Sequence, residues 1–447
     1  MTDFDEDQDG VAVPRGRLNR FARLGATAAG LGMSVLGGGV KAAVSGRRAD
    51  WRGLAFSPAN AQKLTAELAR MRGAAMKVGQ LLSMDAGDLL PPEFAAVLAR
   101  LRADARPMPA RQLKGVLNAA WGEGWLSRFS RFDARPLAAA SIGQVHRAIA
   151  RDGRDLAVKV QFPGVRESID SDVDNVGALI RLSGLLPAGV DIRPLLEAAK
   201  AQLHEEADYQ AEAAALGDFH AWLGASADFR VPRPHPDFTT GEILAMDFIE
   251  SRPLETLDES PQEVRDRVVG QLFALLFREV FELGRMQSDP NLANYRYDPK
   301  GEAVVLLDFG AVRELPGDLV AGYRDLLSAG ALSDQAGLRA AAARIGYLDA
   351  DTPPAQEALL LPMLEAACEP LRAADGFDFG ASDLAARLRD EGMALGLEAG
   401  YRHIPPIDAL YLHRKFGGLY LLARRLRARV DIRGLAAPWL DRRGEAA

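Results

Sequence analysis

Apolar residues in the first quarter of the chain recur at helical spacing. Within residues 57–86 they alternate at intervals of four and three, at Leu64, Leu68, Met71, Ala75, Val78 and Leu82. A Ser-Pro pair opens this segment, and a Pro-Pro pair at 91–92 ends it. Apolar clusters at 94–101 and 113–121 predict two shorter helices. Residues 50–125 are therefore predicted to be helical.

The pattern changes near residue 129, where alternation typical of strands begins. The stretches "SIGQVHRAIA" and "DLAVKVQF" flank Asp152-Gly153, a strong hairpin signal. Buried strands are predicted at 242–249 ("EILAMDFI") and 303–310 ("AVVLLDFG"), and helices from about Pro194 to Trp222, at 261–283 and over most of 316–440. This order predicts a two-lobed α+β fold with a helical N-terminal extension. The expected boundaries are 1–49 for a flexible or membrane-associating segment, 50–128 for the extension, 129–250 for the N-lobe and 251–447 for a helical C-lobe.

Composition is that of a globular protein large enough for two or three domains, with 447 residues, 48% of them hydrophobic. The net charge of −7 argues against general affinity for nucleic acids, which favour a basic surface. The single cysteine, Cys368, excludes an internal disulfide and is interpreted as a core residue rather than a nucleophile.

The N-terminal 50 residues carry charge unevenly. Residues 1–10 hold five acids and are interpreted as a disordered tip. The uncharged run 24–40, "LGATAAGLGMSVLGGGV", is flanked by arginines and lysine and is shorter than the roughly 20 residues that span a bilayer. It is either a membrane-associating segment with its arginines near anionic headgroups, or a flexible glycine-rich linker.

The stretch "MQSDPNLANYRYDP" (286–299) carries the most informative polar residues. Asp289 and Asn294 precede Asp308-Phe309-Gly310, and a predicted hairpin of 295–297 with 304–307 would bring them close to Asp308. Phosphoryl transfer uses such a set, with one Asp orienting the nucleophile and an Asn and another Asp holding Mg²⁺. A second Asp-Phe-Gly, at 378–380, follows no buried strand and is interpreted as an ordinary loop.

Further parts of a phosphate site are expected upstream. Lys159 in "LAVKVQ" lies on a strand ahead of an acidic helix and could contact phosphates beside a helix carboxylate. Helical spacing does not choose among the candidates Glu205, Glu206, Asp208 and Glu212. The glycine-rich loop of protein kinases is missing, because "PLAAASIGQVH" has Ala138, Ala139 and Ala140 in its place. No Ala-Pro-Glu follows Asp308, which argues against an ordinary protein kinase.

Taken together, the chain resembles the UbiB family of atypical kinases, protein-kinase-like ATPases that support ubiquinone biosynthesis. The resemblance covers roughly residues 60–425 and is carried by "KVGQ" at 77–80, "AAASIGQVH", "LAVKVQ", "EADY", "DPNLAN" and "LLDFGA". The loop "QSDPNLANYRYDP" and the stretch "LHRKFGGLYLL" (412–422) are more similar to the mitochondrial branch than to the bacterial branch with its HADPHPGN loop.

The resemblance implies a role for each matching residue. Lys159 would contact nucleotide phosphates with Glu212 as its partner, and Ala138, Ala139, Ala140 and Ser141 would form an alanine-rich nucleotide loop. Asn294 and Asp308 would ligate Mg²⁺, and Asp289 would be the catalytic base. Regulatory roles would fall to Lys77, Gln80, Glu206 and Asp208, with the extension covering the peptide pocket and Lys77 pairing with Glu206 or Asp208.

The implied function is a Mg²⁺-dependent ATP-binding kinase or ATPase in the cytoplasm, peripherally associated with an anionic membrane. Its implied partners are ubiquinone biosynthesis enzymes and lipids that resemble isoprenoid phenols. A nucleotide-gated scaffold without a phosphoryl acceptor is the alternative. The acceptor and the oligomeric state stay open, with a homodimer among the options.

Overall fold

The computed structural model describes residues 73–75, 77–79, 107–182, 192–289, 291–398, 401 and 405–440. The chain divides into two compact units, one of Met1–Gly217 with Arg233–Phe248, the other of Asp218–Pro232 with Ile249–Ala447. The run 24–40 and Gln80 lie outside the described residues. Within the described ranges, no helix has both the length and the apolar character needed to cross a membrane.

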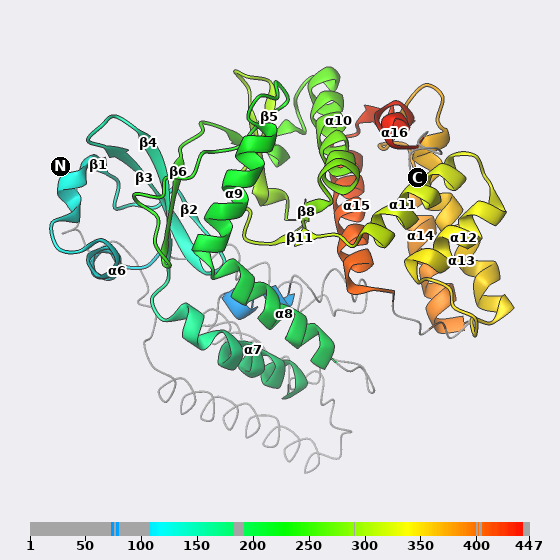
Figure 1. Ribbon diagram of the computed structural model, residues 1–447, viewed down its shortest axis with the longest axis horizontal. Helices are drawn as coiled ribbons and strands as arrows, with labels where there is room; N and C mark the ends of the chain where they lie inside the picture. Colours follow the sequence, from blue (N-terminus) through cyan, green and yellow to red (C-terminus); the bar gives the residue numbers. More distant parts are fainter. Residues whose placement is uncertain are drawn as a thin grey trace, which may run out of the picture. The chain divides into compact units, whose positions relative to one another are not determined.

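The first unit is built on an antiparallel sheet with strand order β1-β3-β4-β6, and β2 pairs with β3 (Figure 1). The strands are β1 (Phe129–Phe132), β2 (Ala138–Ala139), β3 (Gly143–Ala150), β4 (Asp155–Gln161) and β6 (Ile243–Asp247). The predicted hairpin is confirmed as β3–β4, in register from Gly143 opposite Gln161 to Ile149 opposite Asp155. Gly153 turns it with φ +91°, a conformation that glycine adopts without steric strain.

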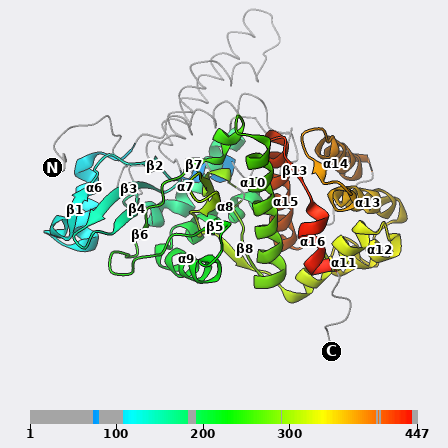
Figure 2. The same ribbon diagram turned by 90° about the horizontal axis from the view of Figure 1, so that it is seen from above.

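Helix α6 (Ala110–Trp121), where a helix was predicted at 113–121, lies beside the β1 end of this sheet (Figure 2). An aromatic core fills the space between them. The rings that pack together are Trp121, Trp125, Phe129, Phe132 and Phe238. The indole Nε1 of Trp121 donates to the Phe238 carbonyl at 2.9 Å, which pairs the one polar atom of its ring. This core fixes β1 and β3 and so gives the loop between β2 and β3 a rigid base.

The helices after the hairpin differ from the prediction of a single helix over 194–222. The structure has α7 (Val165–Leu182), α8 (Arg193–Glu206) and α9 (Tyr209–Leu223). The predicted helix is broken between α8 and α9 because the Asp208 carboxylate accepts from Ala211 N at 3.1 Å and starts a new helix. Helix α7 was not predicted and lies beside α8 (Figure 1), where a Cβ on Gly177 would stand 2.4 Å from Leu196.

The second unit combines short strands with many helices. Strands β5 (Phe229–Arg230), β10 (Ala303–Leu306), β9 (Tyr295–Asp298) and β7 (Arg252–Pro253) form one sheet in that order, and β8 (Arg285–Gln287) pairs with β11 (Val312–Glu314). The predicted pairing of 295–297 with 304–307 is confirmed as the β9–β10 hairpin, with Tyr295 opposite Leu306. The strands extend one pair further than predicted, because Asp298, expected in the turn, lies opposite Ala303.

A third sheet pairs β12 (Phe377–Asp378) with β13 (Arg429–Val430). The main helices of this unit are α10 (Gln262–Arg278) with its π-helical extension η4 (Glu279–Leu283), α11 (Gly317–Ala331), α12 (Gln335–Ile345), α13 (Pro354–Ala367), α14 (Leu384–Met393), α15 (Ile407–Arg425) and α16 (Ile432–Leu440). Cys368 is buried beside α11, and burial raises the pKa of its thiol to about 12. This agrees with its interpretation as a core residue.

Candidate active site

Lys159 and Glu212 form a buried ion pair in the first unit. Lys159 lies on β4, between β3 and β6, and its Nζ donates to both carboxylate oxygens of Glu212 at 2.9 Å. The two side chains are 9% and 1% exposed. The Tyr209 ring lies 5.0 Å from the ammonium. The structure therefore selects Glu212 from the four acids that helical spacing left open.

Lys77 of the extension is also buried in an ion pair, with Glu206 at the end of α8. Its Nζ donates to Glu206 Oε1 at 2.5 Å, while Ser141 Oγ donates to Glu206 Oε2 at 2.7 Å. Glu206 thus joins the extension to the alanine-rich loop. Of the two acids expected to meet Lys77, Asp208 is not the one paired with it, because its carboxylate caps α9 and its side chain is 42% exposed.

The alanine-rich loop is short and held close to β3. Ala138 and Ala139 pair with Val145 and Gln144, and Ala140 N donates to Gly143 O at 2.8 Å. Ala138 and Ala139 are exposed, so their methyl groups lie on the outer surface of the loop. The loop is thus held by its own backbone hydrogen bonds and by the bond from Ser141 to Glu206.

A chain of hydrogen bonds behind this loop was not predicted. Met108 N donates to Gln144 Oε1, Gln144 Nε2 lies 2.8 Å from His146 Nε2, and His146 Nδ1 lies 2.8 Å from the Asp133 carbonyl. All bonds are satisfied when His146 is neutral and protonated at Nδ1. Burial lowers the pKa of His146 to about 4, which favours the neutral form. The "GQVH" stretch therefore anchors the start of α6 to β3.

In the second unit, the loop 288–294 is tied at both ends to the segment around Asp308. At one end Ser288 N and Oγ donate to the Ala311 carbonyl at 2.8 and 3.0 Å. At the other, Leu307 N donates to the Asn294 carbonyl at 3.1 Å. Asp289 lies next to the first tie and Asn294 forms the second, so both belong to a segment that is bonded at each end to residues 307–311.

The side chains of this loop are arranged by local turns. Asp289 Oδ1 accepts from Asn291 N at 3.3 Å, and Asp308 Oδ1 accepts from Gly310 N at 3.0 Å. Asn294 is buried, and its Nδ2 makes no hydrogen bond among the described residues. An unpartnered N–H donor suits an acceptor oxygen such as that of a phosphate or a water, whereas a cation would bind the amide Oδ1 of the same side chain. Since Mg²⁺ takes few protein ligands and completes its shell with phosphate and water oxygens, an Asn beside an Asp fits such an ion.

The described residues contain no cluster of three His, Cys, Asp or Glu side chains that could hold a metal without a substrate. The second Asp-Phe-Gly forms the same local turn as the first, with Gly380 N donating to Asp378 Oδ1 at 3.0 Å, but it differs in its surroundings. Asp378 ends a two-residue strand, Phe377–Asp378, and its Oδ2 accepts from Arg429 at 3.0 Å while its Oδ1 accepts from Gly380 N and Ala381 N. This carboxylate is engaged in a surface ion pair. The sequence predicts an ordinary loop for this stretch, but Phe377 and Asp378 form a short strand opposite Val430 and Arg429.

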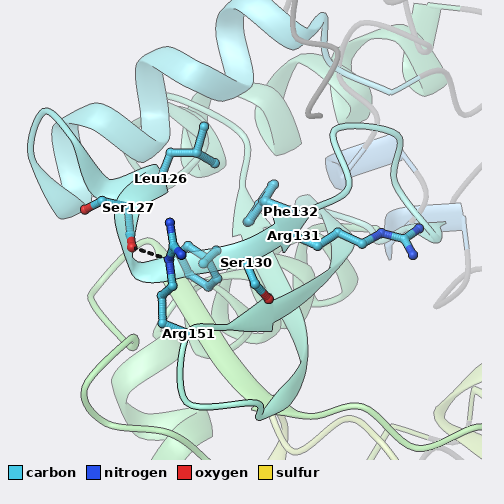
Figure 3. Close-up of a pocket in the computed structure, with 7 residues that line it drawn as sticks. Leu126, Ser127, Ser130, Arg131, Phe132 and Arg151 are labelled. Carbon is cyan, nitrogen blue, oxygen red and sulfur yellow. Dashed lines mark hydrogen bonds between the residues drawn. The ribbon is translucent and has the colours of Figure 1, made fainter.

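A shallow cavity of about 330 Å³ lies in the first unit, at the end of β3 far from the alanine-rich loop (Figure 3). Arg151 points across it, and its Nε donates to the Ser127 carbonyl at 3.1 Å. The other guanidinium, that of Arg131, is paired with Asp133. Because both cations are engaged, the cavity adds nothing to the candidate site.

Comparison with known proteins identifies the family. The ABC1 atypical kinase-like domain matches residues 100–342, over half of the chain. The chain belongs to the ABC1, or UbiB, family of atypical kinases. Atypical kinase COQ8, mitochondrial, of Saccharomyces cerevisiae is 36% identical over 422 residues, 94% of this chain and 84% of that protein. Atypical kinase COQ8B, mitochondrial, of Rattus norvegicus is 35% identical over 425 residues, 95% and 80% of the two chains.

A solved structure, that of Rv3197 from Mycobacterium tuberculosis in complex with erythromycin, aligns with a TM-score of 0.60 at 26% identity. The alignment covers 86% of this chain and 96% of that one. The resemblance seen in the motifs is thus confirmed, as is the α+β kinase-like fold of this ABC1-family member. The roles of individual side chains stay predictions.

Proposed function

We propose that this ABC1-family protein binds ATP with Mg²⁺ and catalyses transfer or hydrolysis of the γ-phosphate. The observation that carries the proposal is the double tie of the loop 288–294 to residues 307–311. It holds one acid, Asp289, and two oxygen donors for a metal, Asn294 and Asp308, on neighbouring stretches of backbone. Such fixed placement is what phosphoryl transfer requires of a protein, because most of its catalysis is positioning and charge stabilisation.

Each side chain has a role within this proposal. Lys159 donates to phosphate oxygens, and Glu212 keeps its ammonium charged and oriented. Asn294 and Asp308 supply oxygens to the metal, and Asp289 accepts the proton of the attacking hydroxyl or water. When bound, Mg²⁺ neutralises charge on the phosphates. The backbone of residues 138–141 lies along the nucleotide in place of a glycine-rich loop.

The biological setting follows from the relatives by analogy. The yeast and rat relatives are named as mitochondrial atypical kinases. We place this chain in ubiquinone biosynthesis, associated peripherally with the cytoplasmic side of an anionic membrane, with enzymes and isoprenoid-phenol-like lipids of that route as partners. Transfer of the γ-phosphate to such a lipid and simple ATP hydrolysis are both compatible with the site.

A second function, a nucleotide-gated scaffold, is favoured by one feature. Glu206 connects Lys77 of the extension with Ser141 of the nucleotide loop. Binding of a nucleotide against this loop could therefore change how the extension sits, without any chemical step. In that case ATP binding, not turnover, would support the biosynthetic enzymes.

Two single substitutions distinguish these functions. Asp289→Asn removes the base and leaves the metal donors, so nucleotide affinity should stay within threefold while ATP turnover falls about 100-fold. Asp308→Asn should remove Mg²⁺-dependent binding. Asp378→Asn makes the same change in the other Asp-Phe-Gly and is the matched control. It is expected to retain both Mg²⁺-dependent nucleotide binding and ATP turnover.

The measurements are binding of a fluorescent ATP analogue with and without Mg²⁺, phosphate release, and ubiquinone content of a deletion strain carrying each variant. Loss of ubiquinone with Asp289→Asn supports the enzyme. Full ubiquinone despite lost turnover supports the scaffold. If Asp289→Asn turns over ATP as fast as Asp378→Asn, Asp289 is not the base and the proposed enzyme is wrong.

A further inference from the structure

A buried ion pair lies directly against the strand that leads into Asp289. Glu279, at the start of η4, and Lys415, in α15, have side chains only 1% and 3% exposed, and the Lys415 ammonium donates to Glu279 Oε2. The same ammonium donates to the Gln287 carbonyl at 2.9 Å. Glu279 Oε1 accepts from Gln287 N at 3.1 Å. Glu279 and Lys415 thus bind both the backbone N–H and the backbone C=O of Gln287.

The pairing of β8 with β11 explains why Gln287 needs such partners. Leu315 N donates to Gly284 O, and Ser288 N donates to Ala311 O, so these two residue pairs are hydrogen bonded across the strands. Hydrogen-bonded and non-bonded pairs alternate in an antiparallel ladder, which makes Gln287 opposite Val312 a non-bonded pair. The N–H and C=O of Gln287 therefore point away from β11, where Glu279 and Lys415 meet them in place of a third strand.

Gln287 is also connected to the other half of the candidate site. Its side-chain Nε2 donates to the carbonyl oxygen of Asp308. A shift of Gln287 would therefore be transmitted to Asp289, two residues on, and to Asp308.

We propose that Lys415 is a positioning residue for the reaction: with Glu279 it clamps the Gln287 peptide and so sets the place of Asp289 relative to Asp308. This inference rests on the function proposed above for Asp289. It also gives a role to the stretch "LHRKFGGLYLL", which contains Lys415 and which no part of the proposed chemistry uses.

The energetics favour a role beyond packing. Burial raises the pKa of Glu279 and lowers the pKa of Lys415, so the surroundings oppose both charges and only their attraction and their hydrogen bonds offset this. An apolar pair of similar volume would avoid that cost. It would, however, leave the buried N–H and C=O of Gln287 without partners. The charged pair is thus suited to holding that peptide.

The test distinguishes two effects of Lys415: holding the loop that carries Asp289, and stabilising the fold as a whole. Lys415→Met leaves a buried carboxylate unpaired and is expected to lower the melting temperature. Adding Glu279→Gln removes the second charge but keeps an acceptor for Gln287 N, so the double variant should regain most of the stability. The Gln287 carbonyl still lacks its donor there. Lys300→Met removes a lysine that is 80% exposed in an ion pair with Glu250 and is the matched control.

For the full chain we expect the double variant to show kcat for ATP hydrolysis at least about tenfold below that of the parent, with KM for ATP within about twofold. Amide hydrogen exchange in peptides covering residues 285–294 should be faster, while Lys300→Met should match the parent in every measurement. The proposal is overturned if the double variant has the same kcat as the parent, or the same rate of amide hydrogen exchange in residues 285–294. If the parent itself releases no phosphate, the proposed enzyme function fails, and exchange alone then decides whether Lys415 holds the loop.

Discussion

The buried imidazole of His146 predicts a loss of stability in mild acid. Its folded pKa of about 4 lies below the ordinary value of 6.5, so the unfolded chain binds the proton more readily. The free energy of unfolding should therefore be unaffected above pH 7, fall as the pH drops below about 6.5, and level off below about 4. From these two values, protonation should cost about 2 kcal/mol at pH 5 and about 3 kcal/mol when complete.

The measurement compares the parent with His146→Gln, which cannot titrate. Urea unfolding followed by tryptophan fluorescence reports on the same core, because Trp121 and Trp125 pack beside Phe132, whose ring stacks on His146. Between pH 7.5 and 5.0 the parent should lose about 2 kcal/mol more than the variant. His204→Gln, at a histidine that is 47% exposed, is the control and should follow the parent.

Parallel pH curves for the parent and His146→Gln would refute the reasoning, since they would mean that burial does not hold His146 neutral. His413, whose pKa is likewise lowered to about 4 by burial, adds acid sensitivity to both proteins equally. Its contribution cancels in the comparison, so the difference between the two curves belongs to His146.

Three further predictions concern the first unit. A Cβ on Gly143 would lie 2.5 Å from a carbonyl oxygen of β4, so Gly143→Ala should lower stability by about 1–3 kcal/mol in thermal unfolding, whereas Gly115→Ala, in open space on α6, should raise it slightly. Lys159→Met should cost about 3–5 kcal/mol by removing the lysine that pairs with the buried Glu212 carboxylate, and adding Glu212→Leu should restore stability but not binding of a fluorescent ATP analogue. Lys77→Ala should change the ratio of the affinities for ADP and ATP, or the rate of autophosphorylation. If both stay as in the parent, Lys77 has no regulatory role.

Features encoded by neighbouring residues could be predicted from the sequence. The hairpin at Asp152-Gly153 and the hairpin that follows Asn294 each need only two alternating strands and a turn, and both have the expected partners. Helix α7 was missed although Ile169, Val173, Val176 and Ile180, all buried, carry the same spacing of four and three that predicts helices elsewhere. The break at Asp208 was missed because an N-cap inside an apolar pattern looks like a solvated helix face.

Pairings between distant residues could not be predicted in the same way. Helical spacing allowed four acids as partners for Lys159, and only the placement of α9 against β4 selects Glu212. Lys415 and Glu279 are 136 residues apart, and nothing near either residue indicates that they meet. A lysine inside an amphipathic helix is usually solvated, so its burial depends on what the rest of the chain places around it.

The three buried pairs, Lys77–Glu206, Lys159–Glu212 and Lys415–Glu279, share a physical property that bears on their purpose. Each joins segments at least 53 residues apart, and in each the lysine side chain is no more than 9% exposed. A buried ion pair seldom stabilises a protein more than an apolar pair of similar size would. Removing one partner, however, greatly lowers the stability, because the other charge stays buried. Each pair therefore permits a single arrangement of its two segments. The segments they fix are the extension, the proposed phosphate-binding strand and the strand leading to Asp289. The buried pairs thus lie where the proposed chemistry requires a fixed geometry. Double variants that replace both charges of a pair should keep the fold stable, and they therefore measure the effect of each pair on function separately from its effect on folding.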